Sequence, residues 1–124
     1  MTDTVLVEDV MSTPIETIAA DATVRAAAEQ MRAHDINGLF VPGSDAGIVT
    51  QTDVVAVVAD GADPDELVVE DVMTSPVERV MTDTELAEAA TMMINFGIKH
   101  LPVMDKHSDY VGMVSSTDTT TEFA

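Results

Sequence analysis

Two stretches of the chain carry apolar residues at the spacing of an α-helix. In each stretch four such residues occupy positions i, i+3, i+4 and i+7: Val24, Ala27, Ala28 and Met31 in the first, and Leu86, Ala89, Ala90 and Met93 in the second. Because this spacing places the four side chains on one helical face, it predicts two amphipathic helices, each with one buried stripe.

Short apolar runs bounded by turn residues follow each predicted helix. They predict two pairs of strands, at 39–41 with 48–50 and at 101–104 with 110–115. Pro-Gly-Ser-Asp at 42–45 is a turn sequence that joins the first pair into a hairpin. Thr52 and Thr117 come after the hairpins and are predicted as N-caps of a further helix, which runs through 54–59 in the first case.

These matching patterns come from a repeated sequence. Residues 7–41 align with residues 69–103 without a gap, and 14 of the 35 aligned positions are identical. The match resumes after a three-residue insertion, where GIVTQTD at 47–53 aligns with GMVSSTD at 112–118. Self-similarity of this kind indicates a duplicated structural unit.

The two tandem repeats are predicted at 1–62 and 63–124, each with the element order β-α-β-β-α. A unit of about 60 residues with so small a sheet leaves one sheet face uncovered. We therefore expect an α+β fold in which the repeats pack sheet to sheet with pseudo-two-fold symmetry. Clefts between the repeats are then the natural binding places.

The charge of the chain is strongly acidic. Its 124 residues include 23 Asp and Glu against 5 Lys and Arg, for a formal net charge of −18, and there is no cysteine. Such a surface repels phosphate backbones and anionic lipid, so neither nucleic acid nor a membrane is expected as a partner. The excess is typical of haloarchaeal proteins in salt-loaded cytoplasm, where the Debye length is about 3 Å. We therefore expect the fold to loosen at low salt. We also expect a cytoplasmic protein, because the apolar runs, such as 54–59, are too short to cross a bilayer and residues 1–4 contain no basic start of a signal peptide.

The repeated motifs resemble those of a known family. VEDVM before a proline, a helix containing Ala-Ala-x-x-Met, Leu-Pro-Val, and the GIVTQTD and GMVSSTD strings are similar to a tandem pair of cystathionine-β-synthase-type (CBS) domains, called a Bateman module. The resemblance covers about residues 7–120. The first repeat departs from the pattern at Phe40, where the second repeat has Pro102.

The resemblance implies a stand-alone regulatory module that binds AMP, ADP or ATP and acts through an unidentified partner protein. No cofactor is required, although ATP would bring Mg²⁺ with it. The alternatives are a sensor of S-adenosylmethionine or NADH, and a scaffold that binds no ligand and serves protein association. No enzymatic activity is expected, because Asp53 has no adjacent pair of base and nucleophile.

Two aspartates are the main candidate ligand residues. Asp53 and Asp118 lie near helix starts, where a carboxylate can accept the hydroxyls of a ribose or serve only to cap the helix. Thr50 and Ser115 precede them and can donate to ribose or phosphate oxygens. The candidates for adenine contact are the extended pieces Thr13-Pro14-Ile15 and Ser75-Pro76-Val77.

The resemblance divides the candidates between two clefts. One would hold Thr50, Thr52, Asp53, Ser75, Pro76, Val77, Lys99 and His100; the other would hold Thr13, Pro14, Ile15, Asn37, Gly38, Ser115, Thr117 and Asp118. Since Asn37 and Gly38 carry no charge, the cleft with Lys99 is expected to bind a phosphorylated ligand better. Lys99 could instead pair with Asp105 or Asp109.

A valine-rich helix and a histidine pair complete the candidates. Val54, Val55, Val57 and Val58 make the helix at 54–59 apolar on nearly every side, and small modules of the family pair through such helices into a disc of four repeats. We therefore expect a homodimer. His100 and His107 with Asp105 match no established spacing of metal ligands, so no metal site is expected.

Overall fold

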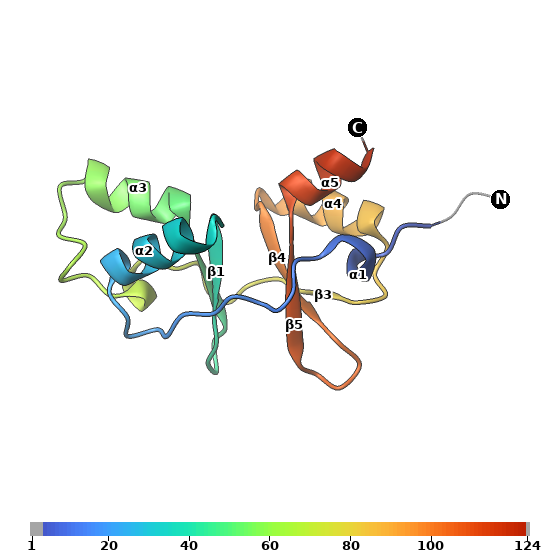
Figure 1. Ribbon diagram of the computed structural model, residues 1–124, viewed down its shortest axis with the longest axis horizontal. Coiled ribbons are helices and arrows are strands. Elements are labelled where there is room, and N and C mark those ends of the chain that lie inside the picture. Colours follow the sequence, from blue (N-terminus) through green and yellow to red (C-terminus); the bar gives the residue numbers. More distant parts are fainter. Residues whose placement is uncertain (1–3, 124) are drawn as a thin grey trace. The chain divides into compact units, whose positions relative to one another are not determined.

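The computed structural model describes residues 4–123, which form two compact units (Figure 1). Unit 1 joins the chain up to Glu16 to the chain from Glu78 onward, and unit 2 is Thr17–Val77. The units therefore differ from the predicted repeats at 1–62 and 63–124, whose first and last positions lie outside the described residues. Each unit contains the VEDVM segment of the other repeat. We call these the lead segments: residues 5–12 in unit 1 and residues 67–74 in unit 2.

Unit 2 is a hairpin covered by two helices. Its elements are α2 (Val24–His34), β1 (Gly38–Val41), β2 (Gly47–Thr50), α3 (Gln51–Ala59) and the 3₁₀ turn η1 (Val69–Asp71). The strands β1 and β2 pair antiparallel with Leu39 opposite Val49, as the two apolar runs predict. The helices α2 and α3 lie side by side against this hairpin (Figure 1).

Unit 1 repeats this arrangement with one more strand. Its elements are α1 (Val7–Val10), β3 (Val80–Met81), α4 (Leu86–Phe96), β4 (His100–Met104), β5 (Tyr110–Ser115) and α5 (Ser116–Phe123). The strand β3 pairs parallel with β4, which pairs antiparallel with β5. In unit 2 the counterpart of β3 is only a single parallel bridge between Thr17 and Phe40. The predicted β-α-β-β-α order is therefore fully formed in one unit and reduced by one strand in the other.

The apolar stripes of the two amphipathic helices form the cores. Val24 and Ala27 on α2, and Leu86 and Ala89 on α4, have no exposed surface. Both helices end in a left-handed residue, Asp35 with φ 53° and Gly97 with φ 64°, which turns the chain back toward the sheet.

The lead segments complete these cores. Val7 and Val69 are fully buried, each in the cluster of the unit that contains its lead segment. Backbone hydrogen bonds fix both segments: the Val7 N–H donates to the Thr84 carbonyl at 2.8 Å, and the Val69 N–H donates to the Ala22 carbonyl at 2.8 Å. Each unit thus obtains a core valine and a chain of hydrogen bonds from outside its own sequence repeat.

Candidate functional site

The helix α3 starts directly at the end of the strand β2, and a reciprocal cap stabilises the junction. The N–H and the hydroxyl of Thr50 both donate to Oδ2 of Asp53, at 2.8 and 3.0 Å. The Asp53 N–H in turn faces the Thr50 Oγ1 at 3.4 Å. This is a capping box, in which the N-cap residue and the third helical residue satisfy each other.

Unit 1 repeats the same junction where β5 meets α5. The N–H and the hydroxyl of Ser115 donate to Oδ2 of Asp118 at 2.8 and 3.1 Å, and the Asp118 N–H faces the Ser115 Oγ at 3.4 Å. Both aspartates are half-buried. The hydrogen bonds of the cap hold each carboxylate through Oδ2.

The predicted N-caps Thr52 and Thr117 are wrong. Both residues lie within the first helical turn and are exposed. Because no loop separates the strand from the helix, the last strand residue takes the extended conformation that an N-cap requires, and Thr50 caps α3.

The extended pieces lie in the same units as the aspartates with which they were grouped. The Ser12 and Met113 backbones exchange two hydrogen bonds, at 2.9 and 3.1 Å, so that Thr13-Pro14-Ile15 leaves the sheet edge beside the strand that ends at Ser115. The Ile48 and Thr74 backbones do the same at 3.0 and 2.9 Å, next to the strand that ends at Thr50. Ser75, Pro76, Thr13 and Pro14 are exposed, whereas Val77 and Ile15 are half-buried. The Ser75 hydroxyl donates to the Asp45 carbonyl at 2.8 Å.

The residues before β1 and β4 support the helix starts through their backbones. The Asn37 carbonyl accepts the Gln51 N–H at 2.9 Å, and the Lys99 carbonyl accepts the Ser116 N–H at 2.9 Å. Gly38 lies opposite Thr50 in the β1–β2 pair. His100 likewise lies opposite Ser115 in the β4–β5 pair.

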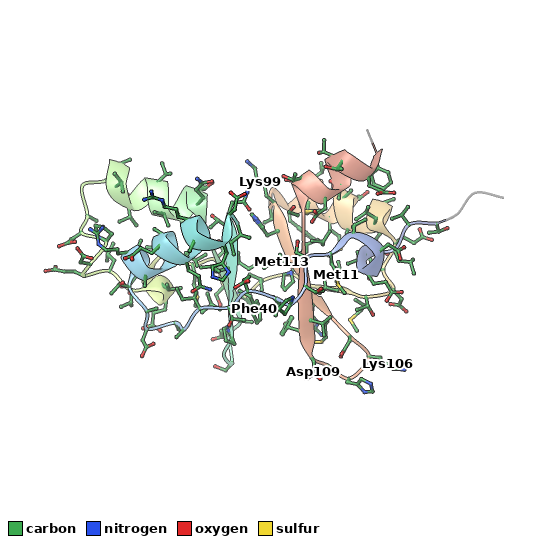
Figure 2. All side chains as sticks on the ribbon, viewed as in Figure 1. Met11, Phe40, Lys99, Lys106, Asp109 and Met113 are labelled. Carbon is green, nitrogen blue, oxygen red and sulfur yellow. The ribbon has the colours of Figure 1, made fainter. Side chains whose placement is uncertain are left out.

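The units hold the cationic candidates in a different grouping from the predicted clefts. Lys99, which is exposed at the start of β4 (Figure 2), and His100 belong to unit 1 with Asp118. Asn37 and Gly38 belong to unit 2 with Asp53. The assignment of Lys99 and His100 to the Asp53 cleft, and of Asn37 and Gly38 to the Asp118 cleft, stays a prediction.

A pair of methionine contacts was not foreseen from the sequence. A Cβ placed on Gly47 would lie 2.6 Å from the Met73 sulfur, and one placed on Gly112 would lie 2.8 Å from the Met11 sulfur. Both partners of each contact recur at equivalent positions of the repeats. That recurrence was the signal that could have revealed them. The two glycines keep the strand free of a side chain where the methionine thioether occupies the space.

Asp105, one of the candidate metal ligands, lies in the β4–β5 loop and has a shifted pKa. Oδ1 of Asp105 accepts the N–H groups of His107 at 2.8 Å and of Asp109 at 3.0 Å. These bonds, chiefly the one from Asp109, hold the pKa of Asp105 below its usual value. Within residues 4–123 no group of three or more His, Cys, Asp or Glu side chains is placed to hold a metal ion. None of the described helices has the length and apolar character needed to cross a bilayer.

Comparison with known proteins identifies the repeated unit. The model of the CBS domain family matches the chain twice, at residues 7–60 and 69–123. The chain belongs to the CBS domain family. A pair of CBS domains is a regulatory module, and this chain contains one such pair.

Relatives of this CBS pair include both longer proteins and isolated pairs. An uncharacterized protein of Methanopyrus kandleri is 36% identical over 95 residues, which cover 73% of this chain and 48% of that protein, so the chain spans about half of that relative. The CBS domain pair of protein MJ0100, solved in complex with 5′-methylthioadenosine and S-adenosyl-L-methionine, has a TM-score of 0.87 at 27% identity and covers 98% of this chain and 97% of that chain. The hexameric CBS-CP12 protein from bloom-forming cyanobacteria has a TM-score of 0.88 at 28% identity over 96% of this chain and 68% of that chain.

Proposed function

We propose that this CBS pair is a sensor of an adenosine-containing ligand, either AMP, ADP or ATP or an S-adenosyl compound, and that it regulates a partner protein without being an enzyme itself. The observation that carries the proposal is the pair of capped aspartates. Each is half-buried and is fixed through Oδ2 at a helix start, so that a ligand would meet Oδ1. The complex of the MJ0100 pair with two adenosyl compounds supports the same class of ligand.

The cap geometry supports one pattern of donors and acceptors between the chain and a ribose. Since the Thr50 and Ser115 hydroxyls already donate to their own aspartates, the ribose hydroxyls act as donors to Oδ1 of Asp53 or Asp118. The hydrogen bonds from Thr50 and Ser115 orient each carboxylate before the ligand arrives, which lowers the entropy cost of binding. The adjoining pieces Ser75-Pro76-Val77 and Thr13-Pro14-Ile15 supply the surface for the adenine. Thr52 and Thr117, on the same first turns, border the ribose.

A thermal-shift screen tests this proposal. Adenosine, AMP, ADP, ATP, S-adenosylmethionine and NADH are compared in molar KCl, with GMP as the control for the base. A true ligand at a hundred times its dissociation constant adds about 2.7 kcal/mol to the free energy of unfolding. If no adenosyl compound moves the midpoint, the scaffold alternative replaces the sensor.

Isosteric variants then locate the site. Asp53→Asn keeps an acceptor for Thr50 but removes the charge that the ribose hydroxyls face, so affinity for that site falls about 10- to 100-fold. Asp60→Asn, at the C-terminal end of the same helix, is the matched control and keeps full affinity. Asp118→Asn tests the second site in the same way. Lys99→Ala tests the phosphate preference predicted for the Asp53 site: it should weaken AMP or ATP more than adenosine.

The exposed valines of α3 support self-association. Val55 is 59% exposed and Val58 65% exposed, whereas Val57 on the same helix is buried. Large apolar side chains left in water favour an interface, and we propose that a second copy covers them in a homodimer. Light scattering of the Val55→Ser/Val58→Ser variant should give the monomer mass where the parent gives the dimer. A parent mass of six chains would instead favour an assembly like that of the hexameric relative.

A further inference from the structure

The thioethers of Met11 and Met73 lock the two lead segments onto their units. The Met11 sulfur lies over Gly112 of β5, and the Met73 sulfur lies over Gly47 of β2. Each sulfur takes the place that a side chain would occupy on the buried glycine. The neighbouring residues Ser12 and Thr74 make the paired backbone hydrogen bonds to the same strands. The methionine and the hydrogen-bonded pair therefore form one contact, present in both units.

We propose that Met11 and Met73 are redox modification sites, at which oxidation to the sulfoxide by a hydroperoxide releases the lead segments. The reaction transfers one oxygen atom to the sulfur. The O–O bond of hydrogen peroxide breaks, an S–O bond forms, the sulfur loses two electrons, and the peroxide leaves as water. A thiol-dependent reductase reverses the change.

Burial separates Met11 and Met73 from Met31, Met93 and Met81. Met92, Met104 and Met113 are half-buried as well, and it is the contact with a glycine that sets Met11 and Met73 apart from them. Met31 and Met93 are 5% and 3% exposed, which shields them from an oxidant. Met81 is 36% exposed, so it reacts readily, but it lies outside the two core clusters. Met11 and Met73 are half-buried and packed against the cores of units 1 and 2. They combine access for a small oxidant with a contact that oxidation can break.

The sulfoxide is incompatible with this contact. Its oxygen is a strong acceptor that requires a donor or water, whereas the sulfur fills the space beside a glycine backbone. To hydrate the oxygen, the lead segment must move away from the strand, which breaks the Ser12–Met113 pair or the Ile48–Thr74 pair. Figure 2 shows Met11 and Met113 where the first of these pairs forms. The displaced segment continues into Thr13-Pro14-Ile15 or Ser75-Pro76-Val77, so oxidation also weakens the adenosine site, a consequence that rests on the proposed function.

Peroxide treatment of the ligand-free chain tests directly whether oxidation of Met11 and Met73 releases the lead segments. Peptide mass spectrometry should find sulfoxide at Met11 and Met73, and the thermal midpoint should fall by about 4–8 °C. Amide exchange at Ser12, Met113, Ile48 and Thr74 should accelerate at the same time. Met11→Leu/Met73→Leu preserves the volume without an oxidisable sulfur and should keep its midpoint, whereas Met81→Leu should remain as sensitive as the parent chain.

Several results would overturn this proposal. Sulfoxide at both positions with unchanged amide exchange removes the proposed displacement, and a leucine double variant that is as sensitive as the parent assigns the effect to other residues. If leucine itself disturbs the fold, Met11→Gln provides a polar mimic of the sulfoxide: it should accelerate exchange at Ser12 and Met113 and leave Ile48 and Thr74 protected. Uniform protection in this variant would refute the proposal. Since these readouts use no ligand, a failure of adenosine binding leaves them interpretable.

Discussion

Asp35 and Gly97 occupy equivalent positions at the ends of α2 and α4, and both adopt left-handed backbone angles. A Cβ costs about 1–2 kcal/mol in this conformation, although Asp tolerates it better than most residues. Asp35 also places a negative charge at the negative end of a helix dipole. The two repeats therefore make the same turn with different residues: glycine fits the left-handed conformation without strain, whereas aspartate does not.

A reciprocal pair of substitutions tests this difference. Asp35→Gly should raise the free energy of unfolding by about 0.5–1 kcal/mol, because it removes both the Cβ strain and the unfavourable charge. Gly97→Ala should lower it by about 1 kcal/mol, since the added Cβ meets no neighbouring atom and only the backbone angle opposes it. Chemical denaturation measures both. Equal effects of the same sign would contradict the assignment.

The stability of the β4–β5 loop depends on pH through Asp105. Lys106 and Asp109 of this loop are labelled in Figure 2. The carboxylate of Asp105 accepts the backbone N–H groups of Asp109 and His107, and its pKa is lowered in the folded chain. The stabilisation is therefore complete above the unfolded pKa of about 3.9 and is lost as the pH falls through the folded value. Amide exchange at positions 107 and 109 should accelerate below about pH 4. Asp105→Asn should abolish this acid step while retaining the acceptor; an unchanged step in the variant would assign it to another group.

At the residue scale, the sequence predicts where a carboxylate lies relative to a helix start more reliably than which residue caps the helix. The recurrence of Thr-x-x-Asp and Ser-x-x-Asp in the two repeats predicted Asp53 and Asp118 near helix starts, and the structure confirms those positions. Of the two roles weighed for these acids, the structure confirms the cap, which uses Oδ2, and the role of ligand anchor stays a prediction. The caps were placed two residues too late, because a direct junction of strand and helix leaves no composition change at the boundary.

At the scale of elements, periodicity predicted the helices and hairpins but not the partner of each lead segment. Val7 and Val69 occur in identical VEDVM strings, and an alignment of two repeats treats each string as part of its own repeat. The cores show the opposite: Val7 packs with Leu86 and Leu101 of the second repeat. Which core a lead segment enters depends on the path of the chain that connects the segment to that core. The pattern of apolar residues does not specify this path.

A Cβ on Gly112 tests the docking of the first lead segment. It would lie 2.8 Å from both the Met11 sulfur and the Ser12 carbonyl oxygen, so Gly112→Ala should destabilise unit 1 by about 1–3 kcal/mol. Adding Met11→Ala should restore only part of this loss, because the contact with the backbone oxygen persists. Thermal unfolding of the single and double variants measures the two contributions. Complete recovery in the double variant would show that the carbonyl moves without cost.

At the scale of the whole molecule, charge opposes the compact state. The net charge is −18, with 5 Lys and Arg against 23 Asp and Glu, and the exposed side chains of Arg25 and Asp65 form an ion pair. So few cations offset little of the repulsion among the acids, which lie in both units. Screening by salt remains as the general remedy, since the Debye length falls from about 10 Å at 0.1 M to about 3 Å at 1 M.

The salt dependence of stability therefore provides the last test. The thermal midpoint should rise steadily between about 0.1 and 1 M KCl, the range over which screening becomes shorter than the spacing of surface charges. A variant with Asp21→Asn, Glu66→Gln, Glu78→Gln and Asp83→Asn neutralises four exposed acids outside the described caps, bringing the net charge from −18 to −14. Because salt also strengthens apolar burial, the slopes must be compared: the variant should start from a higher midpoint at low salt and rise less. Parallel curves for parent and variant would show that salt acts on the cores and not on the charge.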